Sequence, residues 1–213
     1  MKILNLYSGL GGNRTLWRDV DVTAVEINES IAAFYRDRFP DDTVIIGNAH
    51  EYLRKHYKDF DFIWSSVPCQ SHSRARFWTA KSDDTKVDPI YPDMSLYQEI
   101  LFLKHYYRHN WIVENVCPYY EPLIEPQAKI GRHLFWSNRK LNQRFISYDL
   151  DIQSGNRAEY EAELGFSING YEFDIRTVQI LRNCVHPKLG LQLLSYFDRF
   201  VNEKQNSLFK QFK

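Results

Sequence analysis

The sequence predicts an α/β fold in which a mostly parallel β-sheet is flanked by helices. The chain has 213 residues, which suits one domain with a small appendage. Short β-branched segments alternate with helical segments through its first half, and this alternation indicates βαβ units. A glycine-rich turn directly after the first β-branched segment is typical of such a fold.

Apolar, β-branched runs predict the strands. We expect strands over residues 2–8, 22–27, 44–47, 60–67, 111–116 and 132–137. Helical spacing predicts the elements between them, with a first helix from about Asn13 and a second that ends at Phe39, before Pro40. Further helices are expected over residues 50–57, 94–108, 156–164 and 187–202. Residues 70–92 are polar and rich in turn formers, and they form a loop too long to be a mere connector.

Composition narrows the functional classes. With 27 basic and 27 acidic residues the net charge is zero, which removes the usual first indication of a nucleic-acid binder, although charge can be local. Three cysteines without paired spacing favour reduced thiols, and hence a cytoplasmic protein. Met1 runs straight into a strand-like segment, so we expect no signal peptide. No apolar run approaches the ~18 residues of a membrane helix.

The turn after the first strand is a candidate nucleotide-type cofactor site. Its glycines allow the backbone to turn tightly and to approach a ligand. Glu26 ends the second strand, where a carboxylate can accept hydrogen bonds from ribose hydroxyls. The alternative is an ordinary glycine turn with a solvent-facing glutamate.

Cys69 follows Pro68 at the carboxyl end of the fourth predicted strand, where ligands bind in open α/β sheets. Cys117 and Cys184 are better explained as small apolar residues. His72 leaves open an unrelated Cys–His hydrolase. Glu114 ends the next strand, so Cys69 and Glu114 would face one crevice and offer a nucleophile and an acid to the same substrate.

In these motifs, over roughly residues 1–200, the chain resembles the S-adenosylmethionine-dependent DNA cytosine-C5 methyltransferases. The matching stretches are Tyr7–Gly12, Glu26, Pro68–Gln70 and Glu114–Val116, with weaker matches at Lys129–Arg132 and Arg182–Val185. The resemblance implies a Rossmann-like methyltransferase fold. It implies cofactor binding by Tyr7, Ser8, Gly9, Gly11, Gly12, Glu26, Asn48 and Asn183, and catalysis by Cys69, Glu114 and Arg132, with no metal.

The resemblance also implies a mechanism. Cys69 as thiolate would add to carbon 6 of a flipped-out cytosine while protonated Glu114 binds ring N3. Carbon 5 would then accept the methyl group. Residues 70–92 look like a mobile loop that closes over the base. We expect contacts to the nucleic acid from Gln70, Arg74, Arg76, Lys140 and Arg144.

The chain departs from the family pattern in places. Asn5 and Asn48 stand where many members have aspartate. The interval between Trp136 and Asn183, where the family usually carries a substantial target-recognition domain, has room for a hairpin and one helix. We therefore expect a catalytic and cofactor-binding core over residues 1–138, a very small target-recognition segment over 139–175 and a return to the core over 176–213, all within one structural domain.

These features predict a monomeric enzyme that methylates duplex DNA at a short target or with a partner protein. Its expected setting is the cytoplasm of a bacterial or phage-infected cell, where it would serve restriction–modification. Two alternatives remain open. One is the same chemistry on single-stranded DNA, RNA or a free cytosine nucleotide, and the other is a catalytically idle module that binds DNA or a partner.

Overall fold

The computed structural model describes residues 1–82, 87–141, 145–148 and 156–198. They form two compact units. Unit 1 comes from residues 1–8 and 20–143, and unit 2 from residues 9–19 and 144–213. This division follows compactness alone, and the expected division at residues 138 and 175 stays a prediction.

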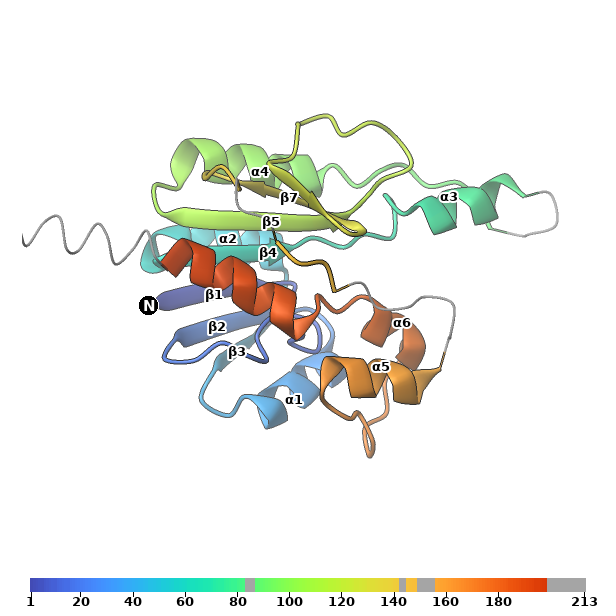
Figure 1. The fold of residues 1–213 in the computed structure, drawn as a ribbon, viewed down its shortest axis with the longest axis horizontal. Coiled ribbons are helices and arrows are strands. Elements are labelled where there is room, and N and C mark those ends of the chain that lie inside the picture. The colour runs from blue at the N-terminus through green and yellow to red at the C-terminus, as the bar shows by residue number, and fades with distance from the viewer. Residues whose placement is uncertain (83–86, 142–144, 149–155, 199–213) are drawn as a thin grey trace, which may run out of the picture. The chain divides into compact units, whose positions relative to one another are not determined.

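Unit 1 is built on a seven-stranded mixed sheet (Figure 1). Its strands are β1 (Lys2–Leu6), β2 (Asp21–Glu26), β3 (Thr43–Ile46), β4 (Phe62–Ser66), β5 (Asn110–Val116), β6 (Ala128–Ile130) and β7 (His133–Ser137). The strand order is β3-β2-β1-β4-β5-β7-β6. The first five strands pair in parallel, whereas β7 runs antiparallel to β5 and to β6. The predicted fold class is confirmed, and β6 is an addition to the predicted strands.

The order of the strands defines one edge of the sheet as a ligand site. Successive strands proceed outward from β1 in one direction and from β4 in the other, so β1 and β4 flank the point at which the order reverses. Ligands bind beyond the carboxyl ends of strands at such a point. Leu6 lies opposite Ser65, and Ser66 lies opposite Glu114. The residues after β1, β4 and β5 therefore leave the sheet at the same edge.

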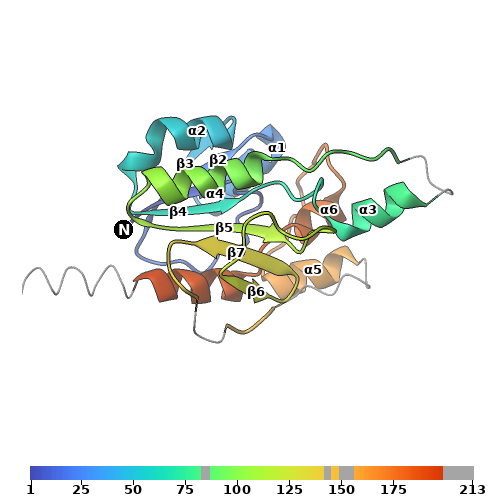
Figure 2. The same cartoon turned by 90° about the horizontal axis from the view of Figure 1, so that it is seen from above.

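A hydrophobic core joins the sheet to α2 (Ala49–His56) and α4 (Ser95–Tyr106). Both helices lie on one side of the sheet (Figure 2). Buried Leu53, Ile100 and Leu103 pack against strand residues such as Ile63 and others in the same cluster. Burial of each such aliphatic side chain contributes about 1.5–3 kcal/mol. This core fixes α4 against the strands that carry the candidate site.

Capping residues set the starts of two helices of unit 1. Asn28 begins α1 (Glu29–Arg38), where its side chain accepts a hydrogen bond from the Ile31 amide, and α1 ends at Phe39 as predicted. Asn48 begins α2 in the same way through the Glu51 amide. A short 3₁₀ helix, η1 (Tyr57–Asp59), follows α2. The segment expected as a loop contains a further helix, α3 (Arg74–Lys81).

Unit 2 contains α5 (Arg157–Leu164), α6 (Thr177–Arg182) and a helix over residues 187–198. The helix expected from about Asn13 is wrong. Residues 12–16 form turns instead, in which the amides of Arg14 and Trp17 bind the carbonyls three residues before them. Only seven residues separate Gly12 from Val20, and Asp19 has a positive φ of 56°, so the segment turns before a helix can be extended. The expected hairpin is also absent from residues 145–148 and 156–182, which hold α5 and α6.

Among the described residues, no helix combines the length and the apolar character that a membrane crossing requires.

A glycine in the helix over residues 187–198 gives a stability test. Replacing glycine by alanine inside a helix ordinarily stabilises it by up to ~1 kcal/mol. At Gly190, however, an added Cβ would lie 2.4 Å from the Asn13 carbonyl oxygen. We expect Gly190→Ala to lower the free energy of unfolding by about 1–3 kcal/mol, because the backbone of Asn13 cannot move away cheaply. Urea denaturation measures this change.

Gly47→Ala is the matched control, because its added Cβ meets no atom within 4 Å. We expect it to change the free energy of unfolding by less than about 0.5 kcal/mol. A stabilised Gly190→Ala variant would show that the close approach to Asn13 is absent in solution.

Candidate active site

Cys69 lies three residues beyond the end of β4 and is partly exposed. Its carbonyl oxygen accepts hydrogen bonds from the amides of His72 and Ser73, both at 3.0 Å, so the chain turns sharply after the thiol. The imidazole of His72 is buried and contacts Tyr120 Oη through Nδ1. His72 Nε2 has no hydrogen-bond partner among the described residues. These contacts give no support to a Cys69–His72 pair.

Glu114 is the second chemical group at this edge, and it is held by a histidine. His133 Nδ1 lies 2.6 Å from Glu114 Oε1, and the two side chains are only 7% and 8% exposed. The Arg132 guanidinium donates from Nε to His133 Nε2 at 3.2 Å. Since Nε2 accepts this bond, the imidazole proton lies on Nδ1 and is donated to the carboxylate. Arg132, His133 and Glu114 therefore form one directed chain of hydrogen bonds.

The pleat of β7 explains why His133, rather than Arg132, contacts the carboxylate. Glu114 lies opposite Phe135 in the antiparallel pairing, and side chains two residues apart share one face of a strand. His133 is on the face of Phe135, whereas a side chain at position 132 starts on the other face. The basic motif predicted Arg132 as the catalytic residue, and in the structure Arg132 reaches Glu114 only through His133.

A side-chain amide links the ends of the two strands that carry Cys69 and Glu114. Buried Asn115 donates from Nδ2 to the Val67 carbonyl at 3.0 Å, two residues before Cys69. Its Oδ1 accepts the amide of Val116 at 2.9 Å. The structure thus brings the thiol and the carboxyl group to the same edge and fixes the backbone between them.

The candidate cofactor residues of unit 1 follow β1, β2 and β3. Ser8 continues the pairing of β1, since its amide donates to the Val25 carbonyl, and its buried Oγ has no hydrogen-bond partner in the described part of the chain. The Glu26 carboxylate accepts the Asn28 amide at 2.9 Å. Exposed Asn48 already uses its side-chain oxygen to cap α2.

The remaining cofactor candidates belong to unit 2. Gly9 and Gly11 have positive φ angles of 52° and 76°, a conformation that favours glycine. Gly12 has a packing reason of its own, because an added Cβ would lie 2.5 Å from the Val185 carbonyl oxygen. Asn183 is exposed and forms the C-cap of α6.

The segment expected to close over a base is attached to the chain just after β5. Phe77 stacks on Tyr119 with ring centroids 4.4 Å apart and an interplanar angle of 5°. Arg74 donates to the Pro118 carbonyl at 3.0 Å, and Arg76 donates to the Asp88 carbonyl at 3.2 Å. Gln70 is exposed beside Cys69. α3 therefore reaches the structure through aromatic and carbonyl contacts that the sequence did not reveal.

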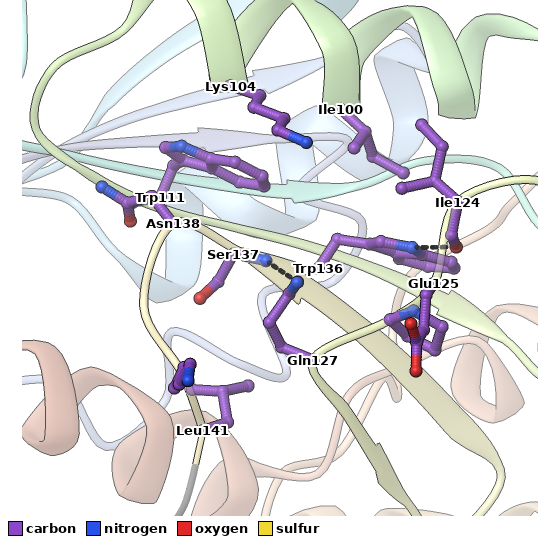
Figure 3. Close-up of a pocket in the computed structure, with 12 residues that line it drawn as sticks. Ile100, Lys104, Trp111, Ile124, Glu125, Gln127, Trp136, Ser137, Asn138 and Leu141 are labelled. Carbon is purple, nitrogen blue, oxygen red and sulfur yellow. Dashed lines mark hydrogen bonds between the residues drawn. The ribbon is translucent and has the colours of Figure 1, made fainter.

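Two predicted nucleic-acid contacts lie apart from this group. Arg144 is outside the described residues. Lys140 lines a cavity of about 840 Å³ at the amino end of β5, on the opposite edge of the sheet from Glu114. Figure 3 shows Ile100 and Lys104 extending from α4 toward the indole rings of Trp111 and Trp136. Cys69, Glu114 and His133 are not among the residues that line this cavity.

The described residues contain no group of three or more His, Cys, Asp or Glu side chains arranged to hold a metal ion.

Sequence reasoning missed two residues with central contacts. His133 lies next to the basic motif, and its position two residues before Phe135 in the strand could have indicated its direction. Glu99 is a fully buried carboxylate on α4 that binds Tyr7, His50 and Ser65. A glutamate on the apolar face of a predicted helix was the available signal.

The model of the C-5 cytosine-specific DNA methylase family matches residues 1–116. The tRNA (cytosine(38)-C(5))-methyltransferase of Spodoptera frugiperda is 34% identical over 80 residues, which cover 34% of this chain and 24% of that protein. The chain therefore matches about a quarter of the length of this relative.

Two solved structures were also found. A Spodoptera frugiperda DNMT2 mutant has 28% identity and a TM-score of 0.39, covering 54% of this chain and 35% of its own. A putative DNA modification methyltransferase encoded within an E. coli prophage has 19% identity and a TM-score of 0.39, covering 57% and 33%.

The His133–Glu114 contact gives a stability prediction. We expect His133→Phe and Glu114→Met each to destabilise the protein, because each leaves the other polar group buried without this partner. The double variant should lose less than the sum, with a coupling of about 1–3 kcal/mol in the free energy of unfolding. A urea-denaturation double-mutant cycle measures this coupling.

The exposed Lys55–Glu51 pair is the control, since its side chains are 58% and 64% exposed. Its coupling, from Lys55→Met and Glu51→Gln, should stay below about 1 kcal/mol. Equal coupling in the two cycles would mean that the buried contact does not form in solution.

Proposed function

The chain belongs to the C-5 cytosine-specific DNA methylase family, and on that basis we propose that it transfers a methyl group from S-adenosylmethionine to carbon 5 of cytosine in DNA. The observation that carries this proposal is the pairing at one sheet edge of Cys69 with a Glu114 carboxyl group oriented by His133. A nucleophile and an acid at one edge suit addition to an aromatic ring.

The methyl donor of this family is S-adenosylmethionine, and residues of unit 1 fit such a molecule. Ser8 offers a buried hydroxyl without a partner among the described residues, and Glu26 offers a carboxylate at the end of β2 for ribose hydroxyls. We propose these residues together with Tyr7 and Asn48. Gly9, Gly11, Gly12 and Asn183, which belong to unit 2, enter the proposal through the family motifs alone.

In the proposed reaction the Cys69 thiolate forms a bond to carbon 6 of a flipped-out cytosine, and Glu114 donates a hydrogen bond to ring N3. Electron density thereby moves to carbon 5, which takes the methyl group that S-adenosylmethionine supplies. Loss of the proton from carbon 5 to a base then expels Cys69 and restores the ring. The bond to carbon 6 forms and breaks within one cycle, so the thiol is regenerated.

The contacts of Glu114 refine its role in this scheme. His133 binds Oε1, so we assign Oε2 to ring N3. A protonated Oε2 is compatible with this arrangement, because Oε1 remains an acceptor for the His133 Nδ1 proton. Arg132 then acts on the carboxyl group through His133 rather than by direct contact.

An RNA substrate is the second candidate. It is favoured by the relative that is 34% identical over 80 residues, whose name gives a tRNA cytosine as its substrate. The chemistry at the cytosine ring would be the same. Duplex DNA with a short target, a partner protein for recognition, a monomeric state and a bacterial or phage setting likewise remain predictions.

Covalent trapping tests the proposed nucleophile. With S-adenosylmethionine and duplex DNA that carries 5-fluorocytosine in varied sequence contexts, we expect a denaturant-resistant adduct, because fluorine cannot leave carbon 5 as a proton does. Cys69→Ser should abolish the adduct, whereas Cys117→Ser, in the matched control, should retain it. Denaturing gel electrophoresis with labelled nucleic acid measures the adduct. An adduct that persists in Cys69→Ser would exclude this nucleophile.

Transfer of a labelled methyl group distinguishes the substrates. We expect incorporation into duplex DNA above incorporation into denatured DNA, a tRNA transcript and dCMP, each at the same cytosine concentration. Incorporation into the tRNA alone would overturn the DNA proposal and keep the family chemistry. No incorporation into any of the four, together with no adduct, would support the catalytically idle module.

A further inference from the structure

Glu99 is a buried carboxylate of α4 that the proposed reaction does not use. Its exposure is 0%, and it accepts three hydrogen bonds from side chains far away in the sequence. Tyr7 Oη donates to Oε1 at 2.5 Å, His50 Nδ1 lies 3.1 Å from the same oxygen, and Ser65 Oγ donates to Oε2 at 2.6 Å. All four residues belong to unit 1.

The position of Glu99 is costly for a purely structural residue. Its neighbours on the helix face, Leu96, Ile100 and Leu103, are buried in the hydrophobic core. Burying a carboxylate is unfavourable unless hydrogen bonds compensate, and a well-packed apolar residue is often as stabilising as a buried polar network. The three donors provide the compensation. The network therefore specifies an arrangement that apolar packing alone would leave free.

Each partner of Glu99 belongs to a segment that carries a proposed site residue. Tyr7 directly precedes Ser8 at the end of β1, and His50 lies two residues after Asn48 in the first turn of α2. Ser65 lies on β4, four residues before Cys69. One carboxylate thus connects the β1 turn, the start of α2 and the strand that leads to the thiol.

The backbone at Tyr7 makes this connection informative. Tyr7 has a φ of 54°, in the left-handed region, which costs a non-glycine residue about 1 kcal/mol. The hydrogen bond to Glu99 holds the side chain of a residue in that conformation. Burial and the neighbouring Glu99 charge raise the pKa of Tyr7, so its hydroxyl remains a donor at neutral pH. The hydrogen bond to Glu99 likewise raises the pKa of His50, which keeps a proton available on its ring.

We propose that Glu99 is a positioning residue for the methyl-donor site, fixing the β1 turn and the start of α2 in the geometry that binds S-adenosylmethionine. This inference rests on the proposed cofactor site. Glu99 itself need not touch the cofactor, because it acts through Tyr7 and His50. The competing explanation is a polar cluster that contributes only to stability.

Glu99→Gln tests the proposal with little change in size. A glutamine side chain has one acceptor oxygen in place of two, so it cannot accept at the positions of both Oε1 and Oε2. We expect the Kd for S-adenosylmethionine, measured by calorimetry without nucleic acid, to rise about tenfold, the effect of one lost charged hydrogen bond. In methyl transfer, KM for S-adenosylmethionine should rise similarly while kcat stays within about twofold.

Two further variants separate positioning from stability. Tyr7→Phe removes one donor and should also raise the Kd, but it should add little in the Glu99→Gln background, because both changes break the same contact. Glu51→Gln, at an exposed position of α2, should leave the Kd unchanged. Lower thermal stability of Glu99→Gln with an unchanged Kd would overturn the positioning role.

The outcome for the wild-type chain distinguishes this inference from the proposed function. Binding of S-adenosylmethionine by the wild type with equal Kd in Glu99→Gln and Tyr7→Phe would overturn the role of Glu99 alone. Absence of binding by the wild type would overturn the cofactor site and the role of Glu99 together. Additive effects of Tyr7→Phe and Glu99→Gln on the Kd would also contradict coupling through their hydrogen bond.

Discussion

Parallel pairing of β4 with both β1 and β5 is the constraint on which the candidate site depends. Parallel neighbours end at a common edge, so residues that follow Leu6, Ser66 and Val116 are brought together although more than a hundred positions separate the first from the last. The Asn115 amide then ties the backbone before Cys69 to the end of β5. Without this pairing, neither the thiol nor the carboxyl group would have a partner within reach.

The elements of unit 1 could be predicted because their signals are local. Alternating β-branched and helical segments, together with Pro40 after α1, identified strands and helices within a few residues of their observed ends. The motifs also identified the ends of β4 and β5 as the edge that carries Cys69 and Glu114. Local signals failed at Asn13, where glycine-rich sequence and a positive φ at Asp19 favour turns over a helix.

The polar contacts could not be predicted, because they join residues that are distant in sequence. Glu99 binds Tyr7 across 92 positions, and His72 contacts Tyr120 across 48. No periodicity records such a contact, since it depends on how helices and strands pack. The assignment of the Glu114 contact to His133 depends on a different feature, the alternation of side chains along β7, which becomes clear only once the pairing with β5 is known.

The hairpin of β6 and β7 has a consequence for how this part of the chain can vary. Ile130 pairs with His133 across a tight turn in which Gly131 has a positive φ of 57°. Adding or removing one residue there would shift β7 by one position against β5, and every side chain of the strand would change faces. The imidazole would leave the carboxylate, and a leucine or an arginine would take its place. Length at this turn is therefore under stricter constraint than the identity of most residues around it, so that insertions are tolerated elsewhere before they are tolerated here.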